Sequence, residues 1–173
     1  MINRTAIDNA LQIALVSLAA YLCGFYFSSL FHLPSAPMGG LWALISGVVV
    51  LQSTWRSTLS SAWLRALGTL IGAIVSAVYL SLLPFNPFAM GACIFAAVLV
   101  CHAAGIPDPA RLAAITVALI MVVSSIDSTV SPITNAALRF IESCLGIAMA
   151  VVAVEVWPRA GGAVQPGVPG DAR

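Results

Sequence analysis

Three charged residues inside apolar stretches are the first candidates for chemistry in this sequence. Arg65 lies in "LRALGTLIG", and Arg139 and Glu142 lie three residues apart in "LRFIESCLG". Charged side chains within membrane-length apolar segments usually face a bundle interior or an aqueous path. Residues three apart share one face of a helix, so the spacing predicts that Arg139 pairs with Glu142. Both arginines are candidates to attract a carboxylate.

Small residues follow both arginines at helical spacing. Small side chains every fourth position allow two membrane helices to approach closely, so each arginine is expected at the head of a helix-packing face. The first face is Arg65, Gly68, Gly72 and Ser76, and the second is Arg139, Glu142, Gly146 and Ala150. An alternative for both arginines is interfacial anchoring, in which the long side chain extends to the lipid headgroups.

Several function classes lack their motifs. The sequence contains no HExxH, no nucleophile elbow and no glycine-rich phosphate loop, which argues against an enzyme and against an ATP-driven pump. The seven basic residues are all arginines, and they form no clustered patch of the kind that binds nucleic acid. The four cysteines form no CxxC pair, so we expect no metal site and no cofactor.

The composition is that of a membrane protein. Of 173 residues, 61% are hydrophobic and 8% are charged, whereas about a quarter of the residues in soluble proteins are charged. Apolar runs between Pro, Gly and charged residues predict an all-α, polytopic bundle of six transmembrane helices. The expected helices are Ile7 to Phe31, Gly39 to Gln52, Leu64 to Leu83, Phe88 to Ala104, Ala110 to Ile126, and Leu138 to Trp157.

The arginines predict an orientation in the membrane. With the N-terminus in the cytoplasm, Arg139 alone lies on the outer side, and every other arginine lies inside, as the positive-inside rule requires. Both termini are therefore expected in the cytoplasm. The Gly- and Pro-rich residues 159–173 are expected to form a disordered cytoplasmic tail after a transmembrane domain of residues 1–158.

The chain resembles itself at a shift of 74 residues. The shift aligns Arg65 with Arg139 and Gly72 with Gly146, and it sets about 7–84 against 85–158. Each unit would contain three helices, and an odd number of spans inverts the second unit in the membrane. The sequence thus predicts two inverted three-helix repeats, with coincidence between two similar helix starts as the alternative.

Residues 39–84 resemble the fusaric acid resistance, or aromatic acid exporter, family. The matching elements are Trp42-Ala43, then Leu51-Gln52-Ser53-Thr54, then Arg65-x-x-Gly68-Thr69-x-x-Gly72. The resemblance implies a multi-pass protein of the bacterial inner membrane that exports aromatic carboxylates, in some members with a periplasmic adaptor. It adds Trp42 and Gln52 to the candidate substrate-binding residues. For Trp42, a place in the interfacial aromatic belt is the alternative.

Together, these features predict an exporter of small organic anions. Because the longer exporters have a second block of helices, we expect this chain to act as a homodimer or higher homo-oligomer in the lipid bilayer. Two alternatives stay open: a passive organic-anion channel, and a non-transporting membrane subunit that docks a partner.

Overall fold

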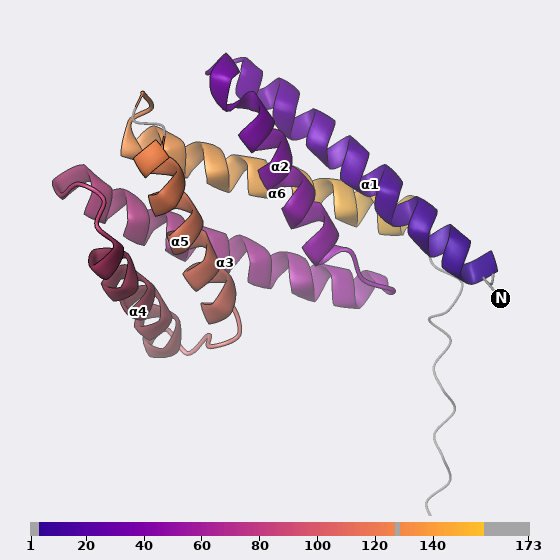
Figure 1. Cartoon of the computed structure of the whole chain (residues 1–173). Helices are drawn as coiled ribbons and strands as arrows, with labels where there is room; N and C mark the ends of the chain where they lie inside the picture. The colour runs from indigo at the N-terminus through magenta and orange to yellow at the C-terminus, as the bar shows by residue number, and fades with distance from the viewer. Residues whose placement is uncertain (1–3, 127–128, 158–173) are drawn as a thin grey trace, which may run out of the picture.

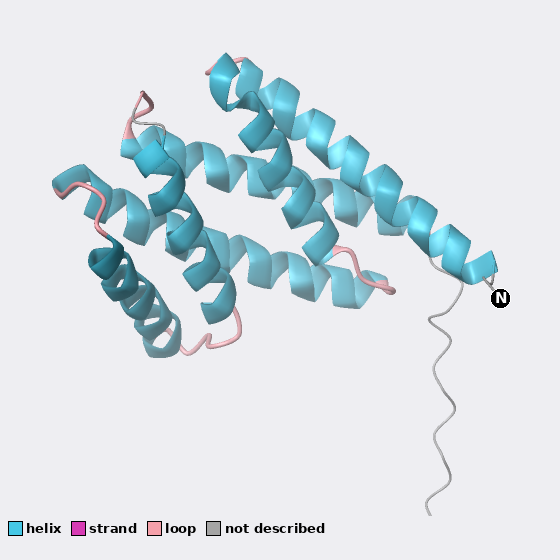
Figure 2. Cartoon of the chain, viewed as in Figure 1, coloured by secondary structure: helices cyan, strands magenta, loops and turns pink. Residues whose placement is uncertain are grey.

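The computed structural model describes residues 4–126 and 129–157, and in these residues it contains helices and no strand (Figure 2). The all-helical prediction is confirmed. The expected tail at 159–173 lies outside the described residues. The elements are α1 (Arg4–Ser29), the 3-10 helix η1 (Leu33–Ser35), α2 (Ala36–Val50), α3 (Trp55–Leu82), α4 (Pro87–Ala103), α5 (Ala110–Ile126) and α6 (Pro132–Val156).

Four segments are long and apolar enough to cross a membrane: α1, η1 with α2, α3, and α6. The other two helices, α4 and α5, are apolar but have 17 residues each. At 1.5 Å per residue they are roughly 25 Å long, somewhat less than the about 30 Å of bilayer hydrocarbon. The chain is therefore a multi-pass membrane protein in which these two helices are the shortest apolar elements besides α2.

Two helices begin more than one turn earlier than the sequence predicted. Helix α3 begins at Trp55 instead of Leu64, because Thr54 accepts a hydrogen bond from the Ser57 backbone N–H and closes a capping box. Helix α6 begins at Pro132 instead of Leu138, where Ser131 supplies the N-cap. Polar first turns hid both starts from a search for apolar runs. As a consequence, Arg65 lies about three turns and Arg139 about two turns inside its helix.

Helices α3 and α6 pack against each other at the centre of the bundle (Figure 1). Helix α2 lies against α6 and is covered by α1, while α5 lies against α3 and is covered by α4. Consecutive helices run in opposite directions, so α1, α3 and α5 begin at one end of the bundle and α2, α4 and α6 at the other. We call these the α3-start end and the α6-start end.

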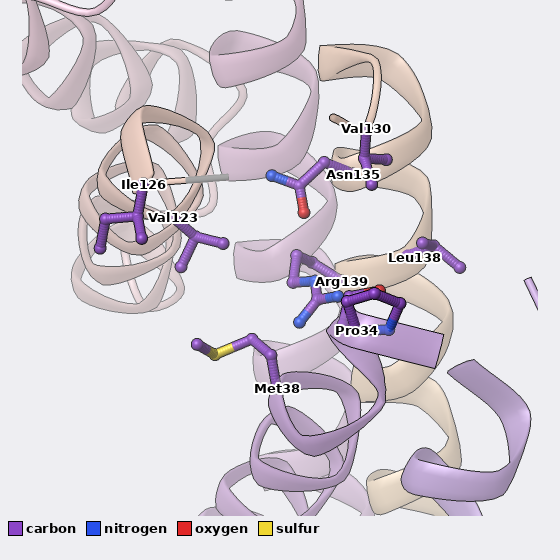
Figure 3. Close-up of a pocket in the computed structure, with 9 residues that line it drawn as sticks. Pro34, Met38, Val123, Ile126, Val130, Asn135, Leu138 and Arg139 are labelled. Atoms are coloured by element: carbon purple, nitrogen blue, oxygen red, sulfur yellow. The ribbon is translucent and has the colours of Figure 1, made fainter. Parts of the chain in front are cut away.

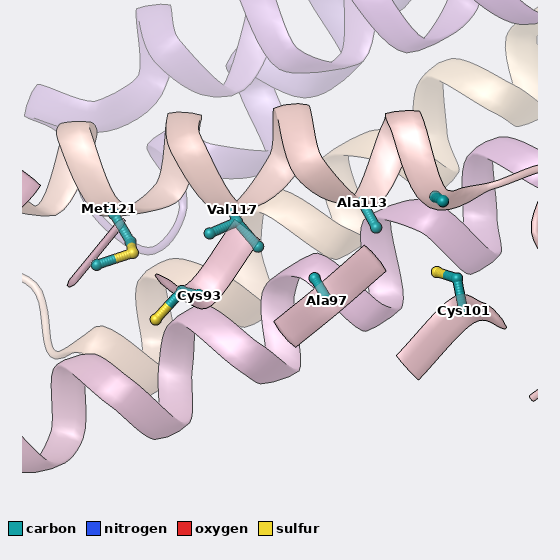
Figure 4. Close-up of a cluster of buried hydrophobic side chains, with 7 residues drawn as sticks. Cys93, Ala97, Cys101, Ala113, Val117 and Met121 are labelled. Atoms are coloured by element: carbon teal, nitrogen blue, oxygen red, sulfur yellow. The ribbon is translucent and has the colours of Figure 1, made fainter. Parts of the chain in front are cut away.

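Small side chains bring the α4–α5 pair into close contact. The buried cluster between these helices consists mostly of alanine, cysteine and valine (Figure 4). With no hydrophobic drive between helices in lipid, such packing depends on close van der Waals approach. The named members are Cys93, Ala97, Cys101, Ala110, Ala113, Val117 and Met121.

Candidate functional site

Both arginines of the predicted site are buried in the protein. Arg65 is 2% exposed and Arg139 is 1% exposed. An anchoring arginine would extend to the headgroups, so the interfacial-anchor interpretation is wrong for both residues. Two buried cations in a chain with few charges require partners inside the bundle, and the two residues find different ones.

Arg139 forms the predicted ion pair with Glu142. Its Nη2 lies 3.2 Å from Oε1 of Glu142, which is fully buried. The same carboxylate oxygen accepts a hydrogen bond from the Ser28 hydroxyl of α1. The guanidinium also lies over the ring of Trp42 from α2, with Cζ 5.9 Å from the ring centroid. Three helices thus hold one buried charge pair, and Trp42 belongs to the cluster rather than to an interfacial belt.

This cluster has spare hydrogen-bonding capacity. Among the described residues, four buried side-chain atoms lack a hydrogen-bond partner, and all four belong to the cluster. They are Trp42 Nε1, Arg139 Nε, Arg139 Nη1 and Glu142 Oε2. Buried polar groups in proteins are nearly always bonded, and leaving one unpaired costs about 1–3 kcal/mol. Three of the four atoms are N–H donors, which suits an anion.

A cavity of about 160 Å³ lies next to Arg139 at the α6-start end (Figure 3). Apolar side chains of α2 and α5, including Met38 and Val123, form much of its wall, and Asn135 adds an amide. The Asn135 side chain is held in place by Ser124, because its Nδ2 donates a hydrogen bond to Ser124 Oγ at 2.7 Å. The full lining is Pro34, Ser35, Met38, Val123, Ile126, Val130, Asn135, Leu138 and Arg139. An apolar space that ends on a guanidinium can hold an apolar group bearing a negative charge.

Arg65 enters a separate network of hydroxyl groups. Its Nε and Nη2 both donate to Ser46 Oγ, at 3.2 Å each. Ser46 bonds Ser143 at 2.9 Å, and Ser143 bonds Thr69 at 3.3 Å. In the described residues the Arg139–Glu142 pair is the one ion pair, so Arg65 has a hydroxyl partner and no carboxylate partner there.

Gln52, the remaining candidate substrate residue, is not brought to this cluster. It is exposed and follows the C-terminal end of α2, whereas the cavity lies at the N-terminal end of that helix. Its backbone N–H donates to Thr58 Oγ1 at 3.1 Å, which fixes the turn between α2 and α3. The "LQ-S/T" element therefore shapes a turn in this structure.

The small residues of both predicted faces lie in helix contacts. A Cβ on Gly68 would lie 2.6 Å from Leu112 Cβ, and one on Gly72 would lie 2.7 Å from the Ala113 carbonyl oxygen, both on α5. On α6, a Cβ on Gly146 would overlap the carbonyl oxygen of Ala43 on α2. Ala150 is fully buried on the same helix, and the buried Ser76 hydroxyl donates to the carbonyl oxygen one turn earlier.

Sequence reasoning missed the hydroxyl partners of the charged residues and the amide in the wall of the cavity. Ser28, Ser46 and Asn135 come from three different helices, and serine is too common in apolar helices to mark a site. One signal was present: the shift of 74 residues that aligns the arginines also aligns Thr69 with Ser143, and these two residues are bonded.

Comparison with known proteins covers most of the chain. The model of the family described as fusaric acid resistance protein-like matches residues 18–153, a span that contains both arginines, Trp42 and Glu142. No curated protein and no solved structure matches the chain. Because the match covers well over half of its residues, the chain belongs to the fusaric acid resistance protein-like family.

Proposed function

We propose that the protein is a membrane transporter, not an enzyme, and that it exports small organic anions such as aromatic carboxylates. The observation that carries this proposal is the apolar-walled cavity beside Arg139, a buried arginine whose Nε and Nη1 have no hydrogen-bond partner in the described residues. The name of its family, which refers to resistance to an organic acid, supports the same substrate class.

The size of the cavity favours a single small ring. Its volume is about 160 Å³. An apolar protein cavity of about 150 Å³ is large enough to bind benzene. A ring packed between Met38 and Val123 would place a ring carboxylate toward the guanidinium of Arg139. The apolar walls then select for the ring and the arginine for the charge.

Binding a carboxylate with two hydrogen bonds would disturb the Arg139–Glu142 pair. Each two-pronged face of a guanidinium uses Nη2, either with Nε or with Nη1. In this structure Nη2 faces Glu142 Oε1, while Nε and Nη1 are unpaired. A substrate carboxylate can therefore first take a single bond and then compete with Glu142 for the second. This competition gives Glu142 a role in releasing or holding the substrate.

Close helix packing between the cavity and the α3-start end favours a transporter over an open channel. Gly146 of α6 lies against the backbone of α2 at Ala43 and Gly47. On the same side of the site, the Ser46 and Ser143 hydroxyls are directly bonded. A passive channel would need a continuous path in this region, whereas a transporter closes one side at a time. The passive channel and the docking subunit are the alternatives that the flux experiment decides.

The remaining parts of the proposal concern location and assembly. Arg4, Arg56 and Arg111 are exposed and lie in the first turns of α1, α3 and α5, at the α3-start end. By the positive-inside rule we assign this end to the cytoplasm of a bacterial inner membrane, with both termini inside. We further propose a homodimer or higher homo-oligomer, with a periplasmic adaptor as a partner of the α6-start end.

Flux into liposomes tests the function. Purified protein is reconstituted, and uptake of benzoate, hydroxybenzoate, fusaric acid and malate is compared with uptake into empty vesicles, with and without a pH gradient. We expect uptake of the aromatic acids and its loss in Arg139→Ala. Arg56→Ala removes an exposed arginine and is the matched control, with uptake unchanged. Uptake equal to that of empty vesicles for every acid would overturn the proposal. A non-transporting subunit that docks a partner would then be the remaining alternative.

A further inference from the structure

The helices of the bundle pack in two matching sets. Helix α1 packs on α2 as α4 packs on α5, and α2 packs on α6 as α5 packs on α3. The lesser contacts match as well, since α1 touches α6 as α4 touches α3. Exchanging the first three helices with the last three leaves the set of contacts between α-helices unchanged. This is the arrangement that two inverted three-helix repeats would give.

Individual hydrogen bonds follow the same exchange. Thr69 and Ser143 are 74 residues apart, so they are counterparts at the shift found in the sequence, and they bond each other at 3.3 Å. Ser61 of α3 donates to the carbonyl oxygen of Val49 on α2, at 3.4 Å. Its counterpart on α6, Asn135, also bonds to α5, through Ser124, which is one residue beyond Val123, the counterpart of Val49. The Thr69–Ser143 bond joins two counterparts, and the other two bonds join counterpart helices, as a pseudo-twofold axis between Thr69 and Ser143 would give.

The two halves differ in how the short helix lies on the long one. A Cβ on Gly72 would meet Ala113 and Thr116 of α5, whereas one on Gly146 would meet Ala43 and Gly47 of α2. At the shift of 74 residues, Ala43 corresponds to Val117, whereas Gly72 meets Ala113. The contact of Gly146 therefore lies about one turn closer to the C-terminal end of its partner helix than the contact of Gly72 does. The same three-helix unit is thus present in two conformations within one chain.

A difference in sequence accounts for the two conformations. The counterpart of Glu142 in the first half is Gly68, and there Leu112 of α5 and Pro109, just before that helix, pack directly on α3. In the second half the Glu142 carboxylate fills the corresponding position and binds Arg139. The cavity lies beside that arginine, with Met38, the counterpart of Leu112, in its wall.

We propose that the two halves exchange conformations, which closes the cavity at Arg139 and opens a counterpart cavity around Arg65 at the α3-start end. The walls of this second anion site are Val49, Ser61 and Leu112, the counterparts of Val123, Asn135 and Met38. Arg65 is ready for an anion because it is buried with a hydroxyl partner and without a carboxylate in the described chain. The inference rests on the proposed transport function and adds its inward-facing site.

Accessibility of single cysteines tests the exchange. The four native cysteines are replaced by alanine, and Met38→Cys and Leu112→Cys are each made in that background. A membrane-impermeant maleimide is applied to intact cells and to inside-out vesicles. We expect Met38→Cys to react from one side and Leu112→Cys from the other. Because minor conformers are populated at roughly 0.1–10%, Leu112→Cys should react at least about tenfold more slowly. Phe95→Cys, which is exposed on α4, is the lipid-facing control and should not react from either side.

Variants that shift the balance complete the test. Glu142→Gly gives the second half the glycine of the first, so it should slow the reaction of Met38→Cys and speed that of Leu112→Cys. Gly68→Glu should act in the same direction by moving α5 away from α3, and it serves as a second variant if the first does not fold. Reaction of both cysteines from one side, or a change at one cysteine without the opposite change at the other, would overturn the proposal. Labelling does not require flux, so reciprocal labelling without anion uptake would reject the proposed function alone.

Discussion

Thr69 of α3 and Ser143 of α6 are hydrogen-bonded at 3.3 Å although 74 residues separate them. Their bond extends the hydroxyl network of Arg65, and the residue before Ser143 on α6 is Glu142, the partner of Arg139. Neighbouring residues of α6 therefore belong to the hydrogen-bond networks of both buried arginines. We expect a substitution at one arginine to affect the other through α6, because both networks depend on the packing of α6 against α2 and α3.

Removal of Glu142 should destabilise the protein strongly. Glu142→Ala leaves Arg139 as an uncompensated buried charge, and breaking a buried ion pair in this way costs about 3–5 kcal/mol. The double variant Arg139→Met/Glu142→Leu should recover most of the loss, because an apolar pair of similar size needs no charge partner. Thermal unfolding in detergent measures both. Glu155→Ala on the exposed face of α6 is the control, with an expected change within about 0.5 kcal/mol. A Glu142→Ala variant as stable as that control would contradict the ion-pair assignment.

Gly146 should tolerate no side chain. Gly146→Ala would place a methyl group into the backbone of α2 at Ala43, and overpacking of this kind costs about 1–3 kcal/mol or more. Gly91→Ala on α4 is the matched control, because a Cβ there meets nothing within 4 Å. We expect the melting temperature to fall for the first variant and to stay the same or rise for the second. Equal melting temperatures would show that α2 and α6 are not in close contact.

Filling the cavity should block the substrate. Val123→Trp adds a large ring to the wall opposite Arg139, and about 1–3 kcal/mol of overpacking corresponds to roughly 5- to 150-fold weaker binding. Val122→Trp changes the neighbouring residue, which is 38% exposed and does not line the cavity, so flux should be retained. Concentration-dependent uptake of benzoate by the two variants measures the difference. The same loss in both would assign the effect to the added bulk in α5 and remove the cavity from the pathway.

A bound anion should stabilise the protein through Arg139. A ligand that binds only the folded state at 100 times its Kd adds about 2.7 kcal/mol of stability. We expect aromatic carboxylates to raise the melting temperature, and the corresponding neutral amides to have no effect, since only the charged group engages the guanidinium. The shift should disappear in Arg139→Lys, because a lysine lacks the planar, forked donors. A shift of equal size in that variant would place the anion elsewhere.

Much of the fold followed from local pattern. Apolar runs located all six α-helices, and the Ala110–Ile126 boundaries of α5 agree with the expected ones. The largest errors were the starts of α3 and α6, where Thr54 and Ser131 cap turns that are polar in composition. Capping is a backbone property of a few residues, so a search for apolar runs does not detect it.

The candidate site could be predicted only in part. Arg139 and Glu142 are three residues apart, so helical periodicity alone placed their side chains on one face. Gln52 lies away from the Arg139 cluster, because the turn after α2 places its motif at the opposite end of the bundle, so its role in substrate binding stays a prediction. The cavity was absent from the prediction, since Met38 and Val123 come from helices far apart in the sequence.

By itself the sequence determined the membrane class, the helical elements and the charge pair, because composition and periodicity act over a few turns of one segment. The tertiary structure alone decided that both arginines are buried, that Ser28 reaches Glu142 across 114 residues, and that the cavity is adjacent to Arg139 and not to Arg65. These facts depend on which helices pack together and on where along their length they touch. In a bilayer that choice is made by close contacts of small residues such as Gly146 with Ala43, which no single segment encodes.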